Sequence, residues 1–317
     1  MREQPGLEAW QQWRNQVDIE TLDSASHHLL SLLYPNLVLH QIDDPHLGRL
    51  KGVYRRTWYA NQLLVKKFEF ILKALQNTQI ATLVLRDVAL ISTCYSDYGH
   101  RPIYHFDIMV HPSNTSAAIE IFKQLGWKLS GYKPPTGERL WKPIKFHDTS
   151  YIHLNLHNHL FWANPQAHTD AQLWANSIDT NINNTSTLVL SPVDQLLHLC
   201  IKLNQKKNQR PIYWLADAAM LINTLTQEAE WVRLVTQAQR YEIILPLKYL
   251  LIELQALLQL SLPDWVVPSL SKMAISYHEL LEYNLSPDNK LILLKAMLVR
   301  LRQNWINMIT LQQSSNL

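Results

Sequence analysis

The sequence predicts an α+β fold, with a small mixed β-sheet between an N-terminal helical segment and a C-terminal helical bundle. Two short apolar runs, 83–85 and 106–110, have the length and composition of buried strands. All seven glycines lie at or before Gly137, so the Leu-rich remainder of the chain favours helix. We therefore expect three domains: N-terminal helices at 1–78, a sheet core at 79–165 and C-terminal helices at 166–317.

The composition is that of an ordinary globular protein, with 47% hydrophobic and 17% charged residues in a chain of 317. The formal net charge of +3 is too small to give a clear nucleic-acid signal. Cys94 and Cys200 lie in apolar surroundings, which indicates buried thiols in a reducing compartment. No apolar run reaches the length of a membrane span, and the N-terminus has no apolar signal-peptide core. These features predict a cytoplasmic protein without a membrane segment.

Helical spacing dominates the first part of the chain. Apolar residues recur with helical period over 7–39, with Asp23 or Ser24 as the expected cap of the second helix, and again over 50–75. After the first strand, residues 88–92 can form a turn of helix, and 98–102 form a turn with Gly99 and Pro102 as breakers.

Strands and one more helix are expected after the second strand. We predict a helix at 113–125, capped by Ser113 or Asn114 and ended by Gly126. Flanking strands are expected at 127–132 and 139–146, and an alternating strand at 151–159. The Asn- and Thr-rich stretch 164–187 is predicted to be a surface connection with one helix near 173–174.

The last part of the sequence is predicted to be helical. Ser191-Pro192, with Asp194 in the first turn, is a typical helix start. Helices are expected at about 192–205, 211–225, 228–240, 243–259, 265–283 and 288–313.

The region around the two buried strands resembles a known superfamily. His105 and Asp107 lie two residues apart, so their side chains point to the same face of the strand. Together with Arg86-Asp87 and Arg101-Pro102, they resemble the polymerase-beta-type nucleotidyltransferase superfamily, and within it a family of bacterial stand-alone nucleotidyltransferase-like proteins. That family has Lys-Gly, then Arg-Pro, then Asp-x-Asp at these positions, and the similarity extends over roughly 25–265.

The resemblance implies a site for nucleotidyl transfer from ATP with two Mg²⁺ ions held by three carboxylates. Only Asp107 is kept here. His105 stands in place of the first acid and Asn155 in place of the third, while His157 matches a family histidine. The implied catalytic set is therefore His105, Asp107 and Asn155, and the loss of two acids predicts weak or absent transfer.

The resemblance also implies a nucleotide-binding set of Arg86, Asp87, Arg101 and Lys202. Asp87 stands where the family has glycine, and its charge would repel phosphate. Structural alternatives are open for two charged residues: Arg101 can pair with Asp97 or Asp107, and Asp217 can pair with Lys202 or Arg210. The basic cluster of Lys202, Lys206, Lys207 and Arg210 can hold a triphosphate or form a solvated helix end.

Three interpretations of the site remain open. The chain can be an active nucleotidyltransferase with an altered metal site, or a noncatalytic relative that binds a nucleotide or a protein. It can also hold Zn²⁺, Fe²⁺ or Mn²⁺ through His105, Asp107 and His157, since two imidazoles and one carboxylate suit such ions better than Mg²⁺. The opposing interpretation is that His153, His157 and His159 are solvent-facing residues of a half-buried sheet.

Overall fold

The computed structural model describes residues 3–130, 143–160, 168–205, 212–276 and 279–280. The chain divides into two compact units. Unit 1 comprises Met1–His198 with Gln209–Thr226, and unit 2 comprises Leu199–Asn208 with Gln227–Leu317. The boundaries expected at residues 78 and 165 both lie inside unit 1.

Unit 1 opens with a helical segment. Its elements are α1 (Glu3–Gln16), η1 (Ile19–Thr21), α2 (Ser24–His27), α3 (Leu30–Leu39) and α4 (Leu47–Asn77). Trp10, Ile19, Leu30, Leu37 and Leu50 form a small core of their own. Asp23 caps α2 as predicted, because its carboxylate accepts from Ser26 N.

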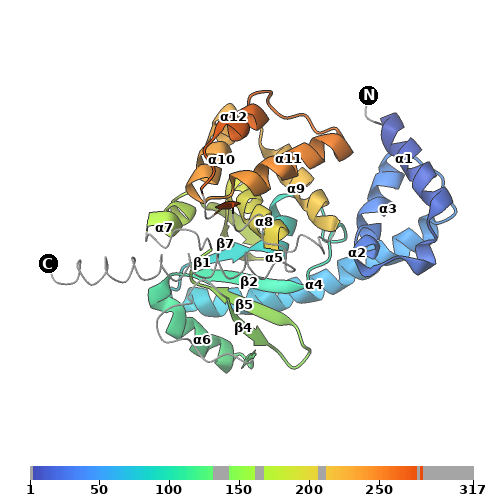
Figure 1. Cartoon of the computed structure of the whole chain (residues 1–317). Helices are drawn as coiled ribbons and strands as arrows, with labels where there is room; N and C mark the ends of the chain where they lie inside the picture. The colour runs from blue at the N-terminus through green and yellow to red at the C-terminus, as the bar shows by residue number, and fades with distance from the viewer. Residues whose placement is uncertain (1–2, 131–142, 161–167, 206–211, 277–278, 281–317) are drawn as a thin grey trace, which may run out of the picture. The chain divides into compact units, whose positions relative to one another are not determined.

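A mixed sheet of seven strands forms the centre of unit 1, in the order β3-β4-β5-β2-β1-β7-β6 (Figure 1). The strands are β1 (Thr82–Leu85), β2 (His105–Val110), β3 (Lys128–Leu129), β4 (Ile144–His147), β5 (His153–His157), β6 (Ile178–Ile182) and β7 (Thr185–Val189). The pairs β2–β5 and β1–β7 are parallel, and the other neighbours are antiparallel. The predicted α+β class is confirmed.

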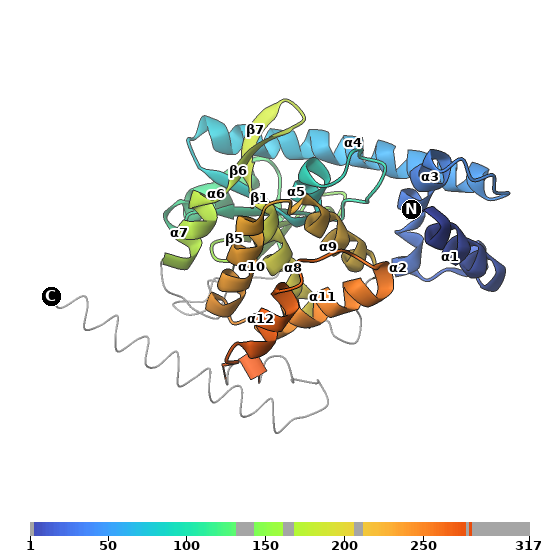
Figure 2. The same cartoon turned by 90° about the horizontal axis from the view of Figure 1, so that it is seen from above.

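One face of the sheet packs on the long helix α4, which runs beside the strands (Figures 1 and 2). Phe68 of α4 meets Phe106 of β2 with ring centroids 4.7 Å apart. The helix α6 (Thr115–Gln124) covers the same core through Ala118 and Phe122. This packing explains the alternation in β2, where Phe106 and Ile108 enter this core and Asp107 points to the opposite face.

The expectation of a surface connection at 164–187 is wrong for its second half. Residues 178–189 form the hairpin of β6 and β7, preceded by α7 (His168–Ala175). Asn183 turns the chain with φ of 55°, a conformation that asparagine tolerates well. The Asn and Thr residues suggested a loop, but threonine is also a good strand former, and β7 is anchored by pairing with β1.

The start of α6 differs from expectation, whereas its end does not. Neither Ser113 nor Asn114 caps α6 through its side chain, because the short helix η2 (Pro112–Asn114) precedes it and Thr115 Oγ1 donates to Pro112 O instead. Gly126, with φ of 86°, does end α6 as predicted. The helix α5 (Arg86–Thr93) lies between β1 and β2 in the chain. The described helices after the last strand are α8 (Pro192–Gln205), α9 (Tyr213–Thr224), α10 (Glu228–Arg240), α11 (Ile244–Leu258) and α12 (Val266–Lys272).

The helix expected at 265–283 is too long, because α12 ends at Lys272 and Met273 is extended. Ser276 Oγ accepts from Glu279 N, which is the geometry of a new helix start. The helix expected at 288–313 lies outside the described residues. Neither Cys94 nor Cys200 is disulfide-bonded within the described part of the chain; Cys200 is buried, as predicted, whereas Cys94 is half-buried. Among the described helices, none combines the length and apolar character that crossing a bilayer requires.

Candidate functional site

The parallel pairing of β2 and β5 brings predicted site residues together. The register places Asp107 opposite Asn155, and Met109 opposite His157. Asn155 Nδ2 donates to Asp107 Oδ1 over 3.1 Å, and His157 Nε2 lies 2.9 Å from the same oxygen. Because an ionised carboxylate only accepts, His157 Nε2 is the donor. The prediction that Asp107 and Asn155 share a face of the sheet is confirmed.

A guanidinium compensates the charge of this buried carboxylate. Arg86 Nη1 lies 3.8 Å from Asp107 Oδ1, and the Arg86 side chain is 25% exposed. Burial alone would raise the pKa of Asp107, but Arg86 and the hydrogen bond from His157 outweigh it and hold this pKa well below its ordinary value. Asp107 is therefore ionised at neutral pH, with its charge balanced by its own chain.

Arg86 has an unusual backbone. It directly follows β1, at the start of α5, and has a φ of 56°. A long side chain in this left-handed region is uncommon, and it is found where the surrounding structure imposes it. The strained turn directs Arg86 toward Asp107.

His105 stands at the start of β2 and is less enclosed. Its side chain is 40% exposed, and its Nδ1 lies 4.0 Å from Asp87 Oδ2. Its ring stacks on His153, with centroids 5.8 Å apart. Burial lowers the pKa of His105 despite the nearby carboxylates, so its neutral form is favoured. His105 shares the face of Asp107, but its closest carboxylate partner is Asp87.

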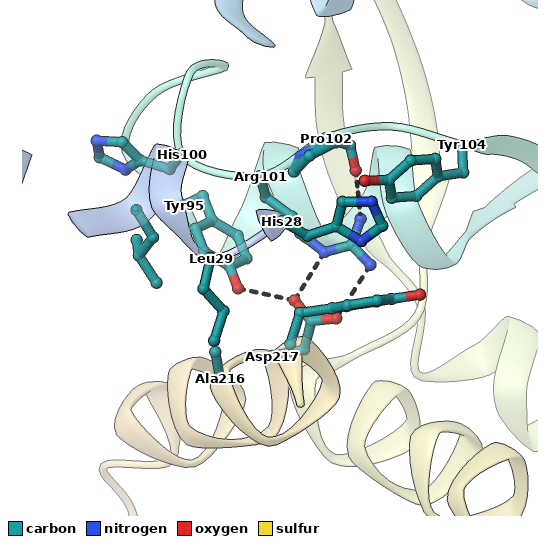
Figure 3. A pocket seen from close by; sticks show the side chains of 11 residues that line it. His28, Leu29, Tyr95, His100, Arg101, Pro102, Tyr104, Ala216 and Asp217 are labelled. Carbon is teal, nitrogen blue, oxygen red and sulfur yellow. Dashed lines mark hydrogen bonds and ion pairs between the residues drawn. The ribbon is translucent and has the colours of Figure 1, made fainter. Parts of the chain in front are cut away.

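Asp87 and Arg101 form a buried charge network with Asp217 of α9. Arg101 Nη2 donates to Asp87 Oδ1 over 2.9 Å, and Arg101 Nε donates to Asp217 Oδ1 over 2.7 Å. Tyr95 Oη donates to Asp217 Oδ1 as well, over 2.7 Å (Figure 3). Asp87 Oδ2 accepts from the backbone N–H of Tyr104. The network ties α5, the segment before β2, and α9 together.

These contacts correct the pairings expected for Arg101, whereas the expected partners of Asp217, Lys202 and Arg210, have side chains outside the described part of the chain. Arg101 pairs with Asp87 and Asp217, whereas Asp97 accepts from Tyr54 Oη. The expectation missed Asp87 because the resemblance placed a phosphate-facing glycine there. Burial opposes ionisation of Arg101, but Asp217 and Asp87 overcome it and raise its pKa. Arg101 is thus a permanently charged, buried residue.

Beside this network lies a pocket that the sequence did not indicate (Figure 3). His28, Tyr104 and Tyr213 line it, and their rings touch: His28 lies 4.7 Å from Tyr104 and 5.4 Å from Tyr213, between centroids. Arg101 lies 5.8 Å from the centre of the Tyr213 ring. Tyr213 and Asp217 are four residues apart, and this spacing in the sequence predicts that both lie on one face of α9.

The donor set does not fit a pair of Mg²⁺ ions. Two such ions need several carboxylate oxygens in octahedral arrangement. Here Asp107 is the one carboxylate among the catalytic set, and its Oδ1 already accepts from Asn155 and His157, which leaves Oδ2 without a protein partner. Among the described residues, no three His, Cys, Asp or Glu side chains are grouped to hold a metal ion.

The remaining predicted residues lie elsewhere. Lys202 belongs to α8, but its side chain is outside the described part, as are Lys206, Lys207 and Arg210. His159 follows the end of β5 and pairs with Asp170 through Nδ1. His153 is exposed, as a solvent-facing strand residue would be, whereas His157 is buried.

Comparison with a family model shows that this is a nucleotidyltransferase-like protein. A family described as an uncharacterised nucleotidyltransferase matches residues 20–259, and the chain belongs to this family. No curated protein matches the chain significantly.

Solved structures with partial similarity include three nucleotidyltransferase-like proteins. The antibiotic-resistance factor ANT(2'')-Ia has 12% identity and a TM-score of 0.45, with 57% of this chain and 94% of that chain covered. The lincosamide antibiotic adenylyltransferase LnuA has 16% identity and a TM-score of 0.38, with 51% and 97% covered. A nucleotidyltransferase-like protein from Paracoccidioides brasiliensis has 15% identity and a TM-score of 0.44, with 68% and 96% covered.

Proposed function

We propose that this chain binds a nucleoside triphosphate such as ATP without a Mg²⁺ pair, and that it transfers the nucleotidyl group weakly or not at all. The observation that carries the proposal is the internal neutralisation of Asp107 by Arg86, Asn155 and His157. A lone carboxylate whose charge is already balanced by an arginine, and whose Oδ1 already accepts two hydrogen bonds, offers little to a pair of hard cations.

The charge balance supports metal-free binding of phosphate. In a three-carboxylate site, Mg²⁺ ions are needed to cancel the repulsion between acids and phosphate. Here Asp107 is the one acid of the implied catalytic set, and Arg86 already offsets its charge, so no metal ion is needed to cancel repulsion between this acid and phosphate. Arg86 is also the partly exposed arginine of the site, whereas Arg101 is buried between two carboxylates. A guanidinium binds phosphate well through its fork of N–H donors, so Arg86 is the residue we assign to the phosphates.

The absence of efficient transfer follows from the same residues. Two-metal catalysis activates the attacking hydroxyl and stabilises the leaving oxygen, and both roles need the missing acids. The neutral form of His105 is favoured, so its imidazole does not supply the negative charge that a carboxylate ligand would offer to Mg²⁺. Binding without turnover is thus the function that this geometry supports best.

Thermal melting with added ligand tests the assignment. In EDTA, ATP should raise the melting temperature of the wild-type protein, because a ligand that binds only the folded form stabilises it. Arg86→Gln should abolish the shift, whereas Arg56→Gln, an exposed arginine on α4, should leave it unchanged. Absence of any wild-type shift would favour the alternative of a protein-binding scaffold. Robust label transfer from ATP that Asp107→Ala abolishes would show that the chain is an active enzyme.

A further inference from the structure

A second polar surface adjoins the candidate site on the same face of the sheet. β3 pairs with β4, β4 with β5, and β5 with β2, in a register that aligns one row across the four strands. That row consists of Lys128, His147, His153 and His105. The residues that alternate with them enter the core on the other face, so the row points away from that core.

This face combines cations with aromatic rings. Lys128 is exposed, and Lys145, in the adjacent row opposite Asn155, is exposed as well. His153 is exposed and stacks on His105, with an angle of 29° between the ring planes. In the two rows, Asp107 is the one carboxylate, and it is buried and neutralised. Among the described residues of these two rows, the exposed side chains are therefore cationic or aromatic.

Tyr151 extends the set of rings at the end of the face. It lies in the turn between β4 and β5, its side chain is 78% exposed, and its φ is 57°. Its ring is nearly parallel to that of His147, with centroids 6.0 Å apart and 9° between planes. Asp148 Oδ1 imposes this turn by accepting from the N–H groups of Ser150 and Ile152. The turn thus presents the Tyr151 ring to solvent.

We propose that this face binds single-stranded nucleic acid. Bases would stack on Tyr151, His147 and His153, while Lys128 and Lys145 pair with backbone phosphates. The row across four strands spans roughly 14 Å, since neighbouring strands lie about 4.8 Å apart, which accommodates a few bases. Flat exposed rings favour nucleobases over an acidic protein, whose side chains offer charge but no planar partner.

The row ends at His105, two residues before Asp107 on β2. A strand lying along the face would therefore have one end beside Arg86 and Asp107. The net charge of +3 does not indicate this surface. Its cations come from separate strands, and the register of the sheet brings them together. The proposal is independent of nucleotide binding at Arg86.

Fluorescence anisotropy of a labelled single-stranded RNA of about twelve nucleotides, titrated with the full chain, tests the proposal. We expect saturable binding that weakens between about 50 and 200 mM salt. Tyr151→Gly should raise the Kd roughly tenfold through lost stacking. Its melting temperature should not fall, because glycine suits a φ of 57°. Lys145→Gln should reduce the slope of log Kd against log salt by roughly 0.7.

The matched controls are Tyr59→Leu and Lys51→Gln, which remove an exposed ring and an exposed cation on α4. Both should bind like the wild type. The proposal is overturned if the wild type shows no saturable binding, or if Tyr151→Gly binds as tightly as the wild type. Displacement by polyglutamate as effective as by unlabelled RNA would overturn it in favour of an acidic protein partner.

Discussion

Asp107 is a buried carboxylate whose hydrogen-bond and ion-pair partners are an arginine, an amide and an imidazole. A single acid in such surroundings keeps its negative charge without a metal ion, because Arg86 supplies the opposite charge. At the scale of individual residues, the proposed function therefore rests on His105 and Asn155 standing where the resemblance implies acids, beside an Asp107 whose charge Arg86 balances.

The double change His105→Asp with Asn155→Asp should reverse this compensation. Three neighbouring acids repel one another, so the metal-free variant should melt at a lower temperature than the wild type and its carboxyl pKa values should rise. Mg²⁺ should recover the loss, by about 2.7 kcal/mol at one hundred times its Kd. A double variant with the same charge change at exposed positions, His40→Asp with Asn176→Asp, should show no Mg²⁺ response. If neither variant responds to Mg²⁺, the proposed geometry of the site is wrong.

Asp87 gives a pH-dependent prediction. Burial tends to raise its pKa, but Arg101 and Arg86 outweigh burial and lower it. A carboxyl group with a lowered pKa stabilises the folded state above its unfolded pKa of about 3.9, and the stabilisation is lost as the pH falls from there toward the folded pKa. We expect Asp87→Asn to cost about 2 kcal/mol at pH 7 and to flatten the decline of stability below about pH 5.

Urea unfolding at a series of pH values measures this effect. Asp179→Asn, a change at an exposed carboxylate on β6, is the control and should leave both the stability and its pH dependence unchanged. An Asp87→Asn variant as stable as the wild type at pH 7 would contradict a structural role for the Arg101 network.

At the scale of elements, the segment between α5 and β2 is held against α4. Asn61 Nδ2 donates to the carbonyl oxygens of Tyr98 and Arg101, and Tyr54 Oη donates to Asp97. Gly99 lets the chain approach α4 closely, since a Cβ there would lie 2.3 Å from the Tyr54 ring. These contacts position Arg101, and with it the start of β2.

Two glycine substitutions near this contact should have opposite effects. Gly99→Ala should destabilise the protein by about 1–3 kcal/mol, because the Tyr54 ring must move. Gly52→Ala, inside α4 with open space around it, should stabilise by about 0.5–1 kcal/mol, because alanine favours helix. Chemical denaturation of both variants measures the difference. Equal effects of the two changes would refute the close approach at Gly99.

Sequence patterns predicted elements best where one period dominates. The helix α4 and the strand β5 could both be predicted from the period of their apolar residues, because each element buries one face. The hairpin of β6 and β7 was not, since its polar strands depend on pairing with β1. The pairing of Arg101 with Asp217 could not be predicted from sequence patterns, because the two residues are 116 positions apart in the sequence.

At the scale of the whole molecule, family membership is shown over residues 20–259, and the β2–β5 pairing follows the parity read from the sequence. The face of β3, β4 and β5 could not be foreseen, because Lys128, Lys145 and Tyr151 share a surface only through strand register and one turn. The proposed function adds that side chains of this nucleotidyltransferase-like protein provide the charge balance for which the resemblance implies metal ions.

Calorimetric titration of the purified chain with ATP, in EDTA and in Mg²⁺, tests that picture most directly. Metal-independent binding through Arg86 predicts a Kd in EDTA that is equal to or lower than the Kd in Mg²⁺, and no binding by Arg86→Gln in either buffer. Binding of ATP that occurs only when Mg²⁺ is present would contradict it.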